Sequence, residues 1–272
     1  MPRLFADSAG DLRTLLPPVE SALGRPVDGC FLYLSGPYGT SRQVIADLRG
    51  AGKALGFCFD ALGPGDVSSY ADGQRIADRA ISAAQALGLP ASVMLAADVE
   101  ESWPFAPAFA CGYADQQRVG PYWKSGALYV AAESPRVRNA MAAARALDGN
   151  AELLELWAAA WQGAGGVPTI PTAWEPPVCA GAPVYAVQFW GQWQGVDLSL
   201  VPDGAPGILE PTAAGQFADV PPDAQYAPDV AAVARAGLME GIGGGLFAPD
   251  GLVNRAQLAT VVARLGRKTG II

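Results

Sequence analysis

The sequence contains no histidine among its 272 residues. This absence excludes serine–histidine–aspartate and cysteine–histidine catalysis and any histidine-ligated metal site. Acid–base chemistry near neutral pH then falls to carboxylates, tyrosine, lysine or cysteine. The 26 aspartates and glutamates are the obvious supply, and the sequence predicts neither a metal nor a cofactor.

Basic residues and long apolar runs are also scarce. The chain has 18 lysines and arginines, a net charge of −8 and no basic cluster, so we expect no nucleic-acid partner. No apolar stretch reaches the ~18 residues of a membrane span, so we expect no membrane insertion. The first residues lack the apolar core of a secretory signal peptide.

The four cysteines are widely spaced, and none forms a Cys-x-x-Cys pair, which argues against a zinc site. Cys30 and Cys58 lie in apolar, strand-like runs, so free buried thiols are expected there. A disulfide between Cys111 and Cys179 stays open as an alternative.

Strand-like runs alternate with helical patterns over the first two-thirds of the chain. Helices are predicted after Ser41 and Ser134, which can cap a helix N-terminus, and before Gly88, which can end a helix. Beyond Gly149 no clear helix separates the strands. The strand-like runs are residues 4–8, 30–36, 54–60, 92–100, 127–133, 153–161, 184–190 and 196–201.

Five strand–helix units followed by three strands predict an α/β barrel of the TIM type over residues 1–203. A doubly wound parallel sheet is the alternative. Residues 204–216 are rich in proline, glycine and alanine and are predicted to be a linker.

A small two-helix module is predicted over residues 217–267. Pro228 begins one helix. Asn254 begins the other, and Gln257 three residues later has the spacing of a capping box. Two short helices bury little apolar surface by themselves. The module therefore needs a partner, either further copies of itself or the barrel.

A set of spaced residues in this module resembles the S-layer homology family. The resemblance implies anchoring to an envelope polysaccharide, with Arg255 as the ligand of a carboxylate. Asp219, Tyr226 and Gln257 would join it, although Asp219 can instead bridge a turn. The three-fold arrangement usual in the family implies a homotrimer. The residues that carry the resemblance are Phe217, Asp219, Val220, Tyr226, Gly237, Leu238, Met239, Gly241, Gly245, Phe247, Pro249, Asn254, Arg255, Ala256 and Gln257.

Carboxylates end several of the predicted barrel strands. Asp98 and Glu100 are two residues apart and therefore face the same side of the fourth strand. The first, third and fifth strands end in Asp7, Asp60 and Glu133, and Asp197 lies in the last strand. Because parallel strands end at one rim of a barrel, we expect these acids to converge there. Glycoside hydrolysis uses such a group of carboxylates.

Three short motifs of the barrel resemble the family 25 glycoside hydrolases, which are lysozyme-like muramidases, and their glycoside-hydrolase-like relatives. The motifs are Asp98–Glu100, the aromatic run Tyr185–Trp190 with Gln188, and Val196–Leu198. The family's Gly-Ile-Asp-x-Ser opening is reduced here to Asp7-Ser8.

The resemblance implies that Glu100 is the general acid. Asp98 would orient an N-acetyl group or stabilise positive charge on the sugar ring, with Asp7 and Asp197 as supporting carboxylates. Each of these acids can instead pair with arginine or cap a turn. The residues expected to contact substrate are Asp60, Trp103, Gln188, Trp190 and Trp193.

The sequence thus predicts a cell-wall glycosidase held on the envelope by its C-terminal module, with peptidoglycan or envelope polysaccharide as partner. A non-catalytic envelope or virion protein with a degenerate barrel is the alternative, and a different wall hydrolase is a third hypothesis. An extracellular or envelope location without a signal peptide suggests a phage lysin, an unusual export route or a chain that begins after processing.

Overall fold

The structure is a computed structural model that describes residues 2–269 except 124–125, 165, 212–216, 218, 222–223, 236–237 and 243–245. The chain forms two compact units. The first comprises residues 1–42 and 54–209, and the second comprises residues 43–53 and 210–272.

The first unit is a closed barrel whose strands follow one another in sequence order. Strands β1 to β7 run parallel, whereas β8 is antiparallel to both β7 and β1. No α-helix lies between β6 and β8 in the part of the chain that the structure describes. The predicted barrel is therefore confirmed, and the doubly wound alternative is wrong. The strands are β1 Arg3–Asp7, β2 Gly29–Tyr33, β3 Ala54–Phe59, β4 Leu95–Asp98, β5 Ala127–Val130, β6 Glu155–Ala164, β7 Val184–Trp193 and β8 Val196–Val201.

Several helices begin and end at the capping residues that the sequence shows. Helix α3 begins after Ser69, whose hydroxyl accepts a hydrogen bond from the Asp72 N–H at 3.1 Å, and it ends at Gly88 in the left-handed conformation. Helix α5 begins after Ser134 as predicted, but the Ser134 side chain makes no capping bond. The helices are α1 Leu12–Leu23, α2 Arg42–Gly50, α3 Tyr70–Leu87, α4 Pro107–Val119, α5 Pro135–Leu147, α6 Ala227–Arg235 and α7 Arg255–Thr269, with short 3-10 turns at Pro64–Asp66 and Ala151–Leu153.

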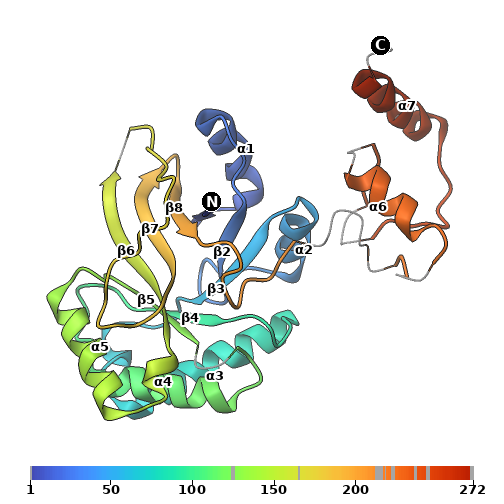
Figure 1. Cartoon of the computed structure of the whole chain (residues 1–272). Helices are drawn as coiled ribbons and strands as arrows, with labels where there is room; N and C mark the ends of the chain where they lie inside the picture. The colour runs from blue at the N-terminus through green and yellow to red at the C-terminus, as the bar shows by residue number, and fades with distance from the viewer. Residues whose placement is uncertain are drawn as a thin grey trace. The chain divides into compact units, whose positions relative to one another are not determined.

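Helices α3, α4 and α5 lie side by side along the barrel (Figure 1). Glycines allow α3 and α4 to approach closely. A Cβ on Gly73 would lie 2.2 Å from the Phe109 carbonyl oxygen, and one on Gly112 would lie 2.0 Å from the Tyr70 carbonyl oxygen. Any larger residue at either position would force the two helices apart.

Aromatic side chains fill the barrel. Phe31 stacks on Trp157 with ring centroids 4.0 Å apart, and the Trp157 Nε1–H donates to the Ser199 Oγ at 3.0 Å. Gly56 provides the space, because a Cβ there would lie 2.3 Å from the Phe31 ring. Trp157 is therefore part of the core. This packed layer forms a floor beneath the carboxyl ends of the strands.

The segment after β8 closes the opposite end of the barrel. The Met94 N–H donates to the Gly207 carbonyl at 3.0 Å, and Leu55 and Leu209 exchange two backbone hydrogen bonds of 2.8 Å. Ile208 is buried beside them. Residues 204–209, the first part of the predicted linker, thus pack against the barrel, and its last part, 212–216, lies outside the described residues.

The C-terminal part of the second unit contains the two predicted helices, α6 and α7. The Asn254 side chain accepts from the Gln257 N–H, and the Gln257 side chain accepts from the Asn254 N–H, both at 2.9 Å. The predicted capping box is confirmed. Two glycines of the expected motif, Gly237 and Gly245, lie outside the described residues.

All four cysteines are free and buried, so the Cys111–Cys179 disulfide is not formed. No helix among the residues that the structure describes is both long and apolar enough to cross a membrane.

Candidate active site

The structure gathers the strand-end carboxylates at one rim of the barrel. Asp7 ends β1 and lies directly opposite Asp197 in the β1–β8 register, because the antiparallel β8 presents its first residues where the parallel strands end. Asp98 ends β4, and its electrostatic neighbours include Glu100 and Asp60. Asp98 in turn raises the pKa of Asp7. The rim therefore brings together five acids from four separate places in the chain.

Asp98 and Glu100 differ in exposure. Asp98 is largely buried, and its Oδ1 has no hydrogen-bond partner in the described part of the chain. Burial and the neighbouring charges of Glu100 and Asp60 raise the pKa of Asp98 to about 8. Glu100 is exposed at the mouth, and partial burial of its carboxyl raises its pKa as well. Neither acid forms an ion pair with a described lysine or arginine.

Asp7 is 2% exposed, and Tyr33 donates a hydrogen bond to its Oδ2 at 3.3 Å. Burial and the charge of Asp197 raise the pKa of Asp7 well above its usual value, although the Tyr33 bond opposes this. Burial also raises the pKa of Asp60, against hydrogen bonds from the backbone N–H groups of Asp60 and Ser35. In both acids the surroundings thus favour the protonated form more than water does.

A hydrogen-bonded chain fixes the last strand acid. The Tyr129 hydroxyl donates to the Gln188 Oε1 at 2.5 Å, and the Gln188 Nε2 donates to the Asp197 Oδ2 at 2.9 Å. The Gln192 N–H donates to the Asp197 Oδ1 at 2.5 Å. These donors favour the ionised form of Asp197, whereas burial is the larger effect and raises its pKa. Gln188 is buried and holds two site residues together.

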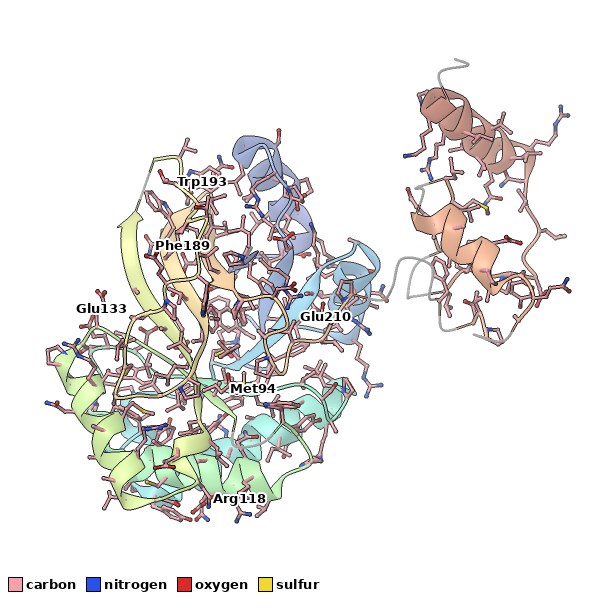
Figure 2. All side chains as sticks on the ribbon, viewed as in Figure 1. Met94, Arg118, Glu133, Phe189, Trp193 and Glu210 are labelled. Atoms are coloured by element: carbon pink, nitrogen blue, oxygen red, sulfur yellow. The ribbon has the colours of Figure 1, made fainter. Side chains whose placement is uncertain are left out.

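Sequence reasoning did not single out Tyr33 and Tyr129. Each shares the inward-facing parity of its strand and lies among the acids, where burial raises its pKa further above the usual value. The available signal was an aromatic residue at an inward position near a strand end, which is also common in plain cores. Glu133, which follows β5, is exposed and is not among the electrostatic neighbours of the rim acids (Figure 2).

The expected substrate-stacking tryptophans have different environments. Trp190 is half-buried against Gly163, where a Cβ would lie 2.5 Å from the indole, and its Nε1 has no partner among the described residues. Trp103 is half-buried, and its N–H donates to the Glu100 carbonyl at 3.1 Å. Trp193, at the end of β7 in Figure 2, is only 6% exposed and offers little surface to a sugar.

In the C-terminal module, Asp219 bonds to the backbone. Its carboxylate accepts from the N–H groups of Phe247 at 2.8 Å and Ala248 at 2.7 Å, and these bonds hold its pKa below the usual value. The alternative expectation for Asp219, a bridge across a turn, describes this geometry. No described cluster of cysteine and carboxylate side chains has the arrangement of a metal site.

Comparison with known families identifies this module. Residues 216–259 match the S-layer homology domain. The resemblance read from the sequence is confirmed, and the match indicates association with the cell envelope. In this S-layer homology domain Arg255 and Tyr226 are exposed at the starts of α7 and α6, while Gln257 completes the capping box and lines a pocket of about 320 Å³.

Solved structures share the barrel fold. An uncharacterized protein of B. stearothermophilus is 22% identical with a TM-score of 0.67, and the match covers 74% of this chain and 96% of that one. A Tat-secreted protein of Mycobacterium tuberculosis is 16% identical with a TM-score of 0.53, covering 76% and 98%. The spore cortex lytic enzyme SleM of Clostridium perfringens is 17% identical with a TM-score of 0.50, covering 74% and 67%. A search of curated protein sequences gives no match.

Proposed function

We propose that the barrel is a cell-wall glycosidase that cleaves peptidoglycan glycan strands by carboxylate acid–base catalysis. The observation that supports this most is the convergence of Asp7, Asp98, Glu100 and Asp197 at one rim without a basic partner among the described residues. The shared fold with SleM, a lytic enzyme, is in keeping with this proposal at the level of architecture.

The chemistry needs a protonated acid at the leaving oxygen and a carboxylate that faces the sugar ring. Glu100 is the exposed acid of the pair and takes the role of general acid, helped by its raised pKa. Asp98 lies deeper and keeps its proton to about pH 8, so it can donate a hydrogen bond to the oxygen of an N-acetyl group. Asp197, oriented by Gln188 and Gln192, supplies negative charge near the ring.

Positioning and binding follow from the surrounding residues. Trp190 offers a half-buried indole for stacking on a sugar. The backbone N–H of Trp103 donates to the Glu100 carbonyl and so restrains the backbone at Glu100. Gln188 acts through Tyr129 and Asp197 and is a positioning residue, with both ends of its amide already engaged.

The Glu100→Gln variant tests the proposal. The amide has nearly the shape of the acid but carries no transferable proton, so release of glycan fragments should fall by about 10²- to 10⁴-fold. Mass spectrometry of fragments from purified walls measures the rate. Glu133→Gln is the matched control, because Glu133 is exposed outside the acid cluster and its variant should keep wild-type activity.

The same experiment separates the other hypotheses. Unchanged activity in Glu100→Gln removes Glu100 from the mechanism. Fragments cut at an amide bond, or derived from another envelope polysaccharide, point to a different hydrolase. Wild-type protein that sediments with walls but releases nothing favours the non-catalytic, glycan-binding alternative.

We further propose that the S-layer homology domain binds an envelope polysaccharide through Arg255, with Tyr226 and Gln257 nearby. Asp219 contributes indirectly by holding the loop at Phe247. Exposed apolar side chains on α7, such as Leu258 and Val262, support assembly into a homotrimer. A molar mass of one chain by sedimentation equilibrium at working concentration would contradict the trimer.

A further inference from the structure

A groove of about 740 Å³ lies beside the acid cluster, between the loop after β2, the end of β3 and helix α3. Its lining combines small apolar residues with polar groups on two sides. The residues that matter here are Ser35, Gly36, Phe59, Gln74, Arg79 and Ser82. The groove is separate from the floor of aromatic residues inside the barrel.

Arg79 is the group in this groove with an uncommitted charge. Its guanidinium lies 5.1 Å from the centroid of the Phe59 ring, and it forms no hydrogen bond or ion pair within the described part of the chain. Arg75, one turn earlier on α3, differs because it binds Asp66 and Asp72, each at 2.8 Å. Asp66 is within electrostatic range of Arg79 but is already occupied by Arg75.

Asp78, the third charged group of the groove beside Arg75 and Arg79, is directed elsewhere. Asp78 accepts a hydrogen bond from Gln116 of α4 at 2.6 Å, which draws its carboxylate toward α4. Stacking on Phe59 restrains the Arg79 side chain before any ligand arrives. A guanidinium fixed in this way presents its planar fork to a carboxylate at little cost in side-chain entropy.

The groove meets the acid cluster at Asp60. A Cβ on Gly36, which lines the groove, would lie 3.3 Å from the Asp60 Oδ2, and Asp60 is an electrostatic neighbour of Asp98. The Ser35 Oγ at the same end is buried and has no partner among the described residues. A chain bound along the groove would therefore continue directly to the rim.

We infer that this groove binds a carboxylate-bearing sugar unit of an envelope glycan, with Arg79 as the ligand of the carboxylate. Gln74 and Ser82 offer hydrogen bonds to hydroxyl and amide groups. Arg79 offers a positive charge and paired N–H donors to a substrate carboxylate, which the acids at the rim do not. The inference rests on the proposed function for the ligand class, a glycan, but it requires no bond cleavage.

The experiment titrates ¹⁵N-labelled full-length protein with N-acetylmuramic acid and with N-acetylglucosamine, which lacks the lactyl carboxylate. Amide shifts at Gln74, Arg79 and Ser82 report binding. We expect tighter binding of the acid, weakened about tenfold or more in Arg79→Ala. Arg79→Lys keeps the positive charge but loses the planar pair of N–H donors. Its affinity for N-acetylmuramic acid should therefore lie between those of the wild type and Arg79→Ala. Arg118→Ala is the matched control, since Arg118 lies on the last turn of α4 and does not line the groove.

Three results would overturn the inference: no shifts at these amides, equal affinity for the two sugars, or equal losses in the Arg79 and Arg118 variants. Failure of the proposed function gives a different signature. In that case wild-type protein releases no glycan fragments from walls, yet N-acetylmuramic acid still shifts the groove amides in an Arg79-dependent way.

Discussion

Different interactions stabilise the barrel and the C-terminal module. In the barrel, large aromatic side chains such as Trp157 and Phe31 are almost fully buried and stack on one another. In the module, Leu252 is fully exposed and Leu258 is 57% exposed, while hydrogen bonds from Asn254, Gln257 and Asp219 fix the local conformation. The barrel supplies its own core, whereas the module leaves large apolar side chains exposed.

The acids of the two regions also differ in their hydrogen bonding and in the direction of their pKa shifts. Asp219 in the module has its hydrogen bonds satisfied by two backbone N–H groups, and its pKa is lowered. Asp98 in the barrel has a buried oxygen without a partner in the described structure, and its pKa is raised to about 8. The hydrogen bonds of Asp219 hold a loop, whereas the unsatisfied, buried carboxyl of Asp98 makes it a candidate functional residue.

Trp157→Ala gives the largest expected effect on stability. The variant loses the stacking on Phe31 and leaves a cavity in the barrel, so the free energy of unfolding should fall by about 3–5 kcal/mol. Leu258→Ala in α7 is the matched change in the module and should alter stability by about 0.5 kcal/mol or less. Denaturant unfolding followed by near-ultraviolet circular dichroism measures both. Equal losses would show that the module has a core of its own.

The pH dependence of stability should have opposite signs in the two regions. Raised pKa values mean that folded Asp98 and Asp7 keep protons which the unfolded chain releases above its usual value of about 4. The barrel should therefore lose stability as the pH rises from about 5 to 8. Its thermal midpoint at several pH values measures this, and Asp98→Asn should flatten the curve.

The module should respond in the other direction. Because the pKa of Asp219 is lowered, its ionised form stabilises the loop above the unfolded value near pH 4, and this contribution disappears as the pH falls through the folded value. Hydrogen exchange at the Phe247 and Ala248 amides, corrected for intrinsic rates, follows the loop. Protection that grows toward acid pH would contradict the assignment.

The alternation of strand-like and helical patterns and the capping residues predicted the barrel, because these signals are local in the sequence. Strand runs ending in acids, Gly88 after α3 and the Asn254–Gln257 pair each act within a few residues. Contacts between distant segments gave no such signal. The hydrogen bonds of Gln188 to Tyr129 and Asp197, and the docking of Leu209 on Leu55, depend on register across the sheet. The composition of residues 204–209 therefore predicts a linker, because the sequence does not show the barrel surface against which they pack.

The smallest expected effect concerns the capping box of α7. Asn254→Ala removes the acceptor for the Gln257 N–H but keeps the backbone N–H that donates to the Gln257 side chain, so the cost should be about 1 kcal/mol. Gln257→Ala removes the reciprocal bond, and the double variant shows whether the two bonds are coupled. Amide hydrogen exchange in the first turn of α7 measures the loss.

The barrel serves as the internal control for this prediction. Its near-ultraviolet transition should stay at the wild-type midpoint in Asn254→Ala, because the capping bonds involve only residues of the second unit. If the barrel midpoint fell together with protection in α7, the two units would unfold as one. The contrast between a self-sufficient barrel and a locally stabilised module would then fail, since cooperative unfolding requires that apolar surface of the module be buried against the barrel or in an assembly.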